Sequence, residues 1–138
     1  MKSLRIFAGI VLLGTAGLGL SGCASGFRSV NSGVTTLQNY LQGSLVPMTT
    51  FSTTDIIRFY VSVTWDDVTE DPDWQVVDWN WYKDGKIVGH YENDRAVFRG
   101  APNLRFITQP AAALGVGHFS VECIIGGKQV ATAEFDVK

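Results

Sequence analysis

Apolar and polar residues alternate with a period of two through most of the chain after Asp55. In the first run the apolar positions are Ile57, Phe59, Val61, Val63 and Trp65. The positions between them are Arg58, Tyr60, Ser62 and Thr64. A period of two is typical of a half-buried strand, because successive side chains of a strand point to opposite faces of its sheet. The run therefore predicts a strand with one face in a core.

The same period recurs in two predicted hairpins. Val77, Trp79 and Trp81 share one face of a run that ends at Asp84-Gly85, and residues 87–91 return as its partner. Near the C-terminus, the alternating apolar residues before Gly126-Gly127 are Phe119, Val121, Cys123 and Ile125. Asp-Gly and Gly-Gly pairs supply the positive φ angles of tight hairpin turns. The alternation places Trp79, Trp81 and Cys123 in the core.

Shorter strands are expected at residues 95–99 and 104–108, which Gly100-Ala101-Pro102 separates. No segment after Asp55 shows a helical period. About seven short strands joined by turns predict an all-β fold, an antiparallel β-sandwich.

Two stretches resemble immunoglobulin-like domains. Trp81-Tyr82-Lys83-Asp84-Gly85-Lys86 is similar to the end of strand C in that family, where the Trp fills the core, and residues 117–123 resemble strand F with Cys123 as the second core cysteine. The chain departs from the family at Val121, where antibody domains carry a Tyr, and at the first core cysteine, whose position Val61 or Val63 holds. The resemblance implies an immunoglobulin-like sandwich without the disulfide.

The N-terminal residues form a different kind of segment. Lys2 and Arg5 are the only charges before an uncharged, apolar run at residues 6–20. A basic start followed by an apolar stretch of this length is the layout of a secretory signal peptide, and the run is short for a helix that spans a bilayer. The sequence therefore predicts a targeting segment at residues 1–22.

The next residues, Leu20-Ser21-Gly22-Cys23, resemble the lipobox of bacterial lipoproteins. The resemblance implies cleavage before Cys23, a diacylglyceryl group on its thiol, and acylation of the new N-terminus with a chain such as palmitate. Three acyl chains exceed the two signals that stable membrane anchoring needs. Ala24 and Ser25 follow where an Asp would resemble an inner-membrane retention signal. We expect an outer-membrane lipoprotein that faces the periplasm or the cell surface.

Cleavage would divide the chain into three parts: the signal peptide at 1–22, a lipidated Cys23 with a tether at 23–50, and the sandwich at 51–138. The tether is rich in Ser, Thr, Gly, Asn and Gln, which favours flexibility, and it leaves a short helix or an edge strand open. Loss of Lys2 and Arg5 leaves nine basic residues against thirteen acidic ones, a net charge of -4 in place of -2. Neither value gives the basic footprint of a general nucleic-acid binder.

The densest group of charges lies between two predicted strands and consists of Asp66, Asp67, Glu70, Asp71 and Asp73. Ca²⁺ prefers six to eight oxygen ligands from a loop that can fold around it. The spacing matches no known calcium loop, and Pro72 restricts how the chain can wrap. Two interpretations stay open: a solvated acidic loop, and a Ca²⁺ site on these five carboxylates.

Trp74 borders that acidic segment, so it is the candidate for an exposed binding residue. An exposed Trp can stack on a sugar or form a hot spot for a protein partner. The other interpretation of Trp74 is burial, because large rings contribute strongly to cores.

Catalytic residues are not evident in the sequence. His90 and His118 fall in different predicted strands, and Cys123 points toward the core, where a thiol is a poor nucleophile. We therefore expect no enzymatic activity and no required cofactor.

The sequence favours a lipid-anchored envelope protein whose sandwich is a non-catalytic protein-binding or structural module. One alternative is a ligand-binding module, with Ca²⁺ at the acidic segment or a glycan on Trp74. Another is an accessory lipoprotein of an envelope or secretion assembly that docks through an exposed strand edge such as Arg95 to Arg99. The expected partners are the membrane, through the lipid on Cys23, and an envelope protein, whereas no nucleic acid is expected.

Overall fold

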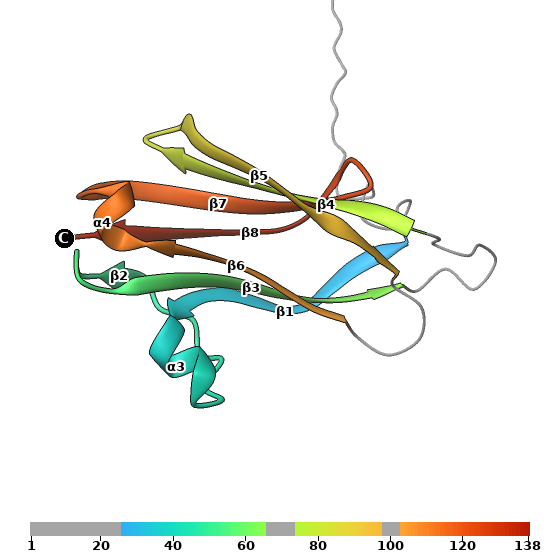
Figure 1. The fold of residues 1–138 in the computed structure, drawn as a ribbon, viewed down its shortest axis with the longest axis horizontal. Coiled ribbons are helices and arrows are strands. Elements are labelled where there is room, and N and C mark those ends of the chain that lie inside the picture. The colour runs from blue at the N-terminus through green and yellow to red at the C-terminus, as the bar shows by residue number, and fades with distance from the viewer. Residues whose placement is uncertain (1–25, 66–73, 98–102) are drawn as a thin grey trace, which may run out of the picture.

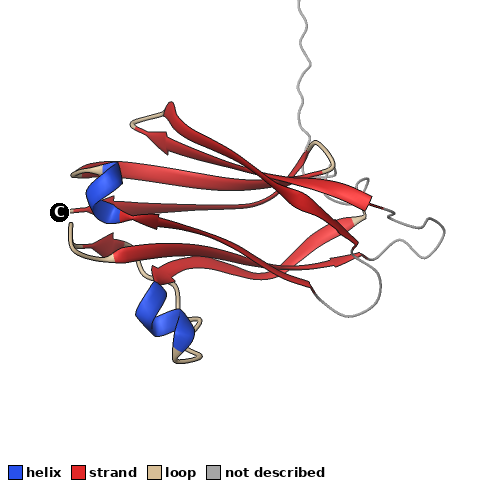
Figure 2. Ribbon diagram, in the orientation of Figure 1, coloured by secondary structure: helices blue, strands red, loops and turns tan. Residues whose placement is uncertain are grey.

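Two β-sheets packed face to face make up the part of the chain that the computed structural model describes, residues 26–65, 74–97 and 103–138 (Figure 1; Figure 2). The three-stranded sheet contains, in spatial order, β1 (Phe27–Thr36), β3 (Ile56–Trp65) and β6 (Asn103–Pro110). The five-stranded sheet contains β2 (Thr50–Phe51), β8 (Lys128–Val137), β7 (Gly117–Ile125), β4 (Trp74–Lys83) and β5 (Lys86–Val97). Two short helices are α3 (Leu37–Leu41) and α4 (Ala111–Leu114).

The predicted immunoglobulin-like sandwich is confirmed. Neighbouring strands pair antiparallel, apart from the short β2, which runs parallel to β8. The order β1-β3-β6 corresponds to strands A, B and E of the immunoglobulin fold, and β8-β7-β4-β5 corresponds to G, F, C and C′. Trp81 then lies on strand C and Cys123 on strand F, as the resemblance of the sequence implies.

Residues 27–41, which lie within the range expected as a tether, form regular structure. Residues Phe27–Thr36 form β1, which pairs with β3 from Phe27↔Trp65 to Thr36↔Ile57. The structure thus contains both elements that the sequence left open, an edge strand followed by a short helix. Seven of the ten residues of β1 are Arg, Ser, Asn, Gly or Thr and show no alternation with apolar residues, so pairing with β3 stabilises its strand conformation.

Helix α3 and the segment after it lie against the outer face of the three-stranded sheet. Thr36 caps the helix by accepting a hydrogen bond from the backbone N–H of Asn39 at 3.1 Å. Tyr60 is fully buried beneath this segment and donates its hydroxyl hydrogen to the carbonyl of Leu45. Its position on the polar side of β3 predicts exposure, which is wrong because residues 37–49 fold over that side. A side chain at Gly33 would clash, since its Cβ would lie 2.8 Å from Cγ of Pro47.

Strand boundaries between residues 86 and 110 differ from the prediction. The separate strands expected at 87–91 and 95–99 are one continuous strand, β5, which ends at Val97. A bulge between Trp81 and Tyr82 in its pairing with β4 shifts the register, which the period in the sequence did not reveal. The four-residue helix α4 follows β6 in a region where no helix was expected, because four residues are too short to show a period.

Both predicted hairpin turns are confirmed. Asp84 and Gly85 have φ angles of 49° and 82°, and Gly126 and Gly127 have φ angles of 59° and 83°. Two consecutive residues with positive φ form a turn whose twist matches that of paired antiparallel strands. The turns therefore fix the β4–β5 and β7–β8 registers.

Large rings fill the space between the sheets. Trp79 of β4 meets Phe59 of β3 edge to face, with ring centroids 5.5 Å apart. Phe135 of β8 packs against Trp81 at 6.1 Å and stacks on Phe119 at 5.4 Å. All five rings are buried, and edge-to-face pairs of this kind add to the gain from burial itself. The core thus joins β3 of one sheet to β4, β7 and β8 of the other.

We predict that Trp79→Ala lowers the free energy of unfolding by about 3–5 kcal/mol, because it leaves a cavity between the sheets. Trp79→Phe should lower the free energy of unfolding by less than Trp79→Ala does. The indole N–H of Trp79 has no hydrogen-bond partner within the described residues, and the substitution removes that buried donor. Urea unfolding measures both. Ile87→Ala, at an exposed position, is the control and should change stability by less than about 0.5 kcal/mol. An equal effect of Ile87→Ala and Trp79→Ala would contradict this account.

Candidate functional site

Several residues that the sequence singles out lie outside the described residues. They are Cys23 and the five carboxylates Asp66, Asp67, Glu70, Asp71 and Asp73. Lipidation of Cys23 and Ca²⁺ binding at the carboxylates therefore stay predictions. Among the residues that the structure does describe, no helix is long and apolar enough to cross a membrane.

Two other predicted binding elements are placed only by their backbone. Trp74 is the first residue of β4, and its exposure stays a prediction. Arg95 to Val97 form the end of β5, which is an edge strand of the five-stranded sheet, whereas Phe98 and Arg99 lie outside the described ranges. An edge strand presents unpaired backbone groups that a partner strand could use.

Trp79, Trp81 and Cys123 all lie in the core, where the alternation places them. Burial raises the pKa of the Cys123 thiol to about 12, although the nearby positive charge of Arg105 acts in the opposite direction. A thiol in this state stays protonated at neutral pH and is unreactive. Cys123 is therefore a small core residue, and within the described residues it has no disulfide partner.

The outer face of the five-stranded sheet is polar, and Glu122 is the centre of its hydrogen bonds. The Glu122 carboxylate accepts hydrogen bonds from Tyr82, from Asn80 at 3.0 Å and from Gln129 at 2.7 Å. Burial acts to raise the pKa of Glu122, but these hydrogen bonds outweigh burial and the pKa lies below its ordinary value. The carboxylate is thus ionised and fully engaged, which suits a structural cross-link between β4, β7 and β8.

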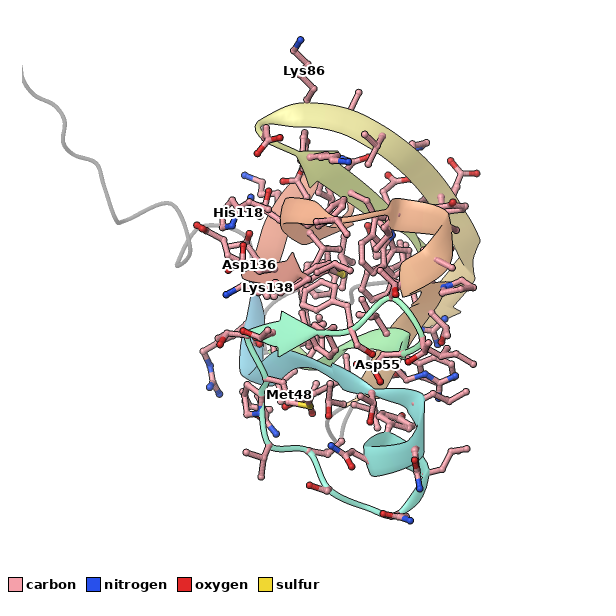
Figure 3. All side chains as sticks on the ribbon, turned by 90° about the vertical axis from the view of Figure 1, so that its left-hand side faces the viewer. Met48, Asp55, Lys86, His118, Asp136 and Lys138 are labelled. Atoms are coloured by element: carbon pink, nitrogen blue, oxygen red, sulfur yellow. The ribbon has the colours of Figure 1, made fainter. Side chains whose placement is uncertain are left out.

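His118 lies on the same face, at the end of the sandwich shown in Figure 3. Its Nδ1 is 2.8 Å from the carboxylate of Asp136, and its Nε2 is 3.0 Å from that of Glu134. Both ring nitrogens can donate to the two carboxylates at once only when the ring is protonated, so this geometry favours the charged form of His118. Hydrogen bonds to Asp136 and then to Glu134 accordingly raise the pKa of His118. A ring held in this way has no free nitrogen to act as a general base.

His90 is bound less strongly. Its Nδ1 lies 2.6 Å from the side-chain oxygen of Asn80, and its Nε2 lies 3.7 Å from the carboxylate of Asp78. Within the described residues, no group of three or more His, Cys, Asp or Glu side chains is arranged to hold a metal ion. The described polar groups on the outer face of the five-stranded sheet hydrogen-bond mainly to one another. The face still presents charged side chains that a partner could contact.

The other candidate surface is apolar. Five large hydrophobic side chains are exposed on α3, on the segment after it, or on the outward side of β3 and β6. We call these residues the α3 face. Their exposed fractions are 71% for Leu41, 67% for Val46, 43% for Ile56, 42% for Leu104 and 43% for Phe106. Single exposed apolar residues are ordinary, whereas several on one side of a molecule can form an interaction surface.

A cation lies between two rings in the middle of this face. The guanidinium carbon of Arg58 is 4.5 Å from the centre of the Tyr40 ring and 3.9 Å from that of Phe106. Nε of Arg58 donates a hydrogen bond to Thr108 at 2.8 Å. This stack joins α3 to β3 and β6 and holds Phe106 in a fixed position with its other side exposed.

A groove of about 480 Å³ opens where α3 meets the start of β3. Its apolar lining comes from Leu37, Leu41 and Ile56, and its polar lining includes Asp55 and Gln38. The Asp55 carboxylate accepts a hydrogen bond from the backbone N–H of Ser52 at 2.8 Å, which fixes the rim of the groove. Three of the eight lining residues are apolar and five are polar, so the groove combines apolar contact with groups that can hydrogen-bond to a partner.

The sequence did not predict the α3 face. Residues 34–41 permitted a short helix, but nothing in their order indicates which side of the sandwich the helix covers. One signal was available: Tyr60 and Phe106 are aromatic residues at positions where alternation predicts a solvated face. Aromatic rings at such positions indicate that something covers them or binds there.

Comparisons with solved structures support the fold. An immunoglobulin-like protein from Pseudomonas aeruginosa matches with a TM-score of 0.52 and 13% identity, over 81% of this chain and 96% of that one. The C-terminal domain of wzt matches with a TM-score of 0.60 and 13% identity, over 82% of this chain and 74% of that one. The fold is thus similar to an immunoglobulin-like sandwich module. Identities this low establish architecture and leave function to the residues of the site.

The DNA glycosylase AlkC from Pseudomonas fluorescens, solved bound to DNA with an abasic site analog, also matches, with a TM-score of 0.56 and 14% identity over 82% of this chain. This chain spans 30% of the length of that enzyme, so the likeness concerns one part of it. No protein-family model and no curated protein matches the sequence.

We predict that the pKa of His118 lies above 6.5 and that Asp136→Asn lowers it, because the substitution replaces the carboxylate acceptor that raises this pKa most with a neutral amide. The stabilising effect of the charged ring is fully present below the pKa of the unfolded chain, about 6.5. It is lost as pH rises through the higher pKa of the folded state.

NMR titration of the imidazole resonances measures the pKa directly. Glu92→Gln, which changes an exposed carboxylate on β5 away from His118, is the control and should leave the His118 pKa in place. A His118 pKa below 6.5 in the unmodified protein would show that the two carboxylates do not hold a charged ring.

Proposed function

We propose that the protein is a lipid-anchored envelope protein whose immunoglobulin-like sandwich is a non-catalytic protein-binding module. The anchor rests on the signal-peptide layout of residues 1–22 and on the lipobox-like Leu20-Ser21-Gly22-Cys23. The binding role rests on one structural observation, the five exposed apolar residues of the α3 face with the groove beside them.

The partner of the α3 face is proposed to be a protein and not a glycan or an ion. The exposed part of the face is formed by aliphatic side chains and one phenylalanine, which gain free energy by leaving water. The one described cation at its centre, Arg58, is engaged with Tyr40, Phe106 and Thr108. A protein segment with its own apolar side chains complements such a surface.

The non-catalytic role is supported by the state of the groups that could do chemistry. The Cys123 thiol is buried and protonated, and both ring nitrogens of His118 are bonded to carboxylates. Nucleophilic and general-base catalysis both need a group that is activated and accessible.

Crosslinking in intact cells followed by purification of the lipidated protein tests the proposal. We expect a stoichiometric protein partner with the unmodified chain and at least about tenfold less of it with Leu41→Asp or Ile56→Asp, because a charge would be desolvated in an apolar contact. Both positions are exposed, so thermal unfolding of the two variants should be unchanged.

Ile87→Asp is the matched control, because Ile87 is an exposed Ile on β5 of the other sheet. It should keep the partner. Loss of the partner with Ile87→Asp alone, or an equal yield with all three variants, would contradict a binding role for the α3 face. A Cys23→Ser variant that stays in the membrane fraction after its signal peptide has been removed would contradict the anchor.

A further inference from the structure

We infer that the sandwich stands end-on at the membrane, with the Phe27 end facing the lipid headgroups and the α3 end directed away from them. The Phe27 end comprises the start of β1, the end of β3 and the Gly126-Gly127 hairpin, and the α3 end comprises α3, the groove and the Asp84-Gly85 hairpin. This inference rests on the proposed lipidation of Cys23.

The distance between Cys23 and the start of the sandwich carries the argument. Only three residues, 24–26, separate Cys23 from Phe27, the first residue of β1. A fully extended chain advances at most about 3.6 Å per residue, so Phe27 lies within roughly 15 Å of the lipidated residue. A tether up to residue 50 would have allowed roughly 90 Å and every orientation.

Phe27 itself is firmly held, so the strand does not lengthen the tether by fraying. Its side chain is 8% exposed, and its ring meets that of Trp65 edge to face with centroids 4.7 Å apart. It pairs with Trp65 across β1 and β3. A Cβ placed on Gly126 would lie 3.9 Å from the Phe27 ring, so the β7–β8 hairpin of the other sheet meets it there.

The Phe27 end and the α3 end are separated by the length of the strands that run between them. β1 runs from the Phe27 end to α3, and β3, β4 and β7 connect the same two ends (Figure 1). Strands of nine or ten residues at about 3.3 Å per residue place the ends roughly 30 Å apart. Figure 3 looks onto the α3 end, where Lys86, Asp55 and Lys138 lie.

Covalent reach and not charge sets this orientation. Arg28 and Lys128 are exposed basic residues at the Phe27 end. Trp65 and Trp74 also lie at that end, and the sequence between them carries five carboxylates that offset the basic charge. We therefore expect the same orientation on neutral and on anionic bilayers. The consequence for function is that the groove faces the aqueous compartment, where a protein partner can reach it.

Energy transfer to a membrane acceptor tests the inference on the full lipidated protein in liposomes that contain a rhodamine-labelled lipid. Lys128→Cys and Lys86→Cys form a matched pair of donor positions, because each is the exposed first strand residue after a two-residue turn, one at each end. Cys123 is buried and should not react. Donor quenching should be several-fold stronger at residue 128 than at residue 86, in liposomes of phosphatidylcholine alone and with added phosphatidylglycerol.

Flotation of the liposomes distinguishes a wrong orientation from a missing anchor. Equal quenching at both positions in protein that floats with the liposomes would overturn the end-on orientation and leave the anchor intact. Protein that does not float would overturn the anchor and the orientation together. Insertion of a 24-residue Gly–Ser linker after Ser25 supplies an internal control, since it should bring the two quenching values together.

Discussion

The face-to-face packing of two sheets across a layer of aromatic rings is the contact on which the rest of this molecule depends. Trp79 and Trp81 of one sheet and Phe59 of the other are buried there, and each sheet alone would expose them to water. Because that layer fixes the inner faces, the two outer faces are free to differ. One is a network of carboxylates and their donors around Glu122, and the other is the apolar α3 face.

The sequence predicted the parts of the fold that local period and turn chemistry specify. Alternation identified β3, β4 and β7 with their inward residues, and Asp84-Gly85 and Gly126-Gly127 identified two hairpins. It failed for β1, whose polar residues have no strand pattern of their own and extend because β3 offers them a pairing edge. Alternation wrongly predicted that the Tyr60 side chain is exposed. Its burial depends on residues 37–49 folding over the outer face of the sheet, and the residues around Tyr60 do not indicate this.

The position of β1 also changes what an anchor at Cys23 would do. With a long tether, the sandwich would sample many orientations and any face could meet a partner. With only three residues between a lipidated Cys23 and Phe27, the chain itself would hold one end of the sandwich near the bilayer, and a partner in solution would reach the α3 end with its groove first. An anchor at Cys23 and the groove beside α3 would then lie at opposite ends of the sandwich.

The measurement that tests this account most directly is the intact mass of the protein extracted from the membranes of cells that express the full chain. The account predicts a polypeptide that begins at Cys23 and carries a diacylglyceryl group on its thiol and an acyl chain on its amino group. A mass that equals an unmodified polypeptide, whatever its first residue, would contradict the anchor and with it the orientation of the sandwich.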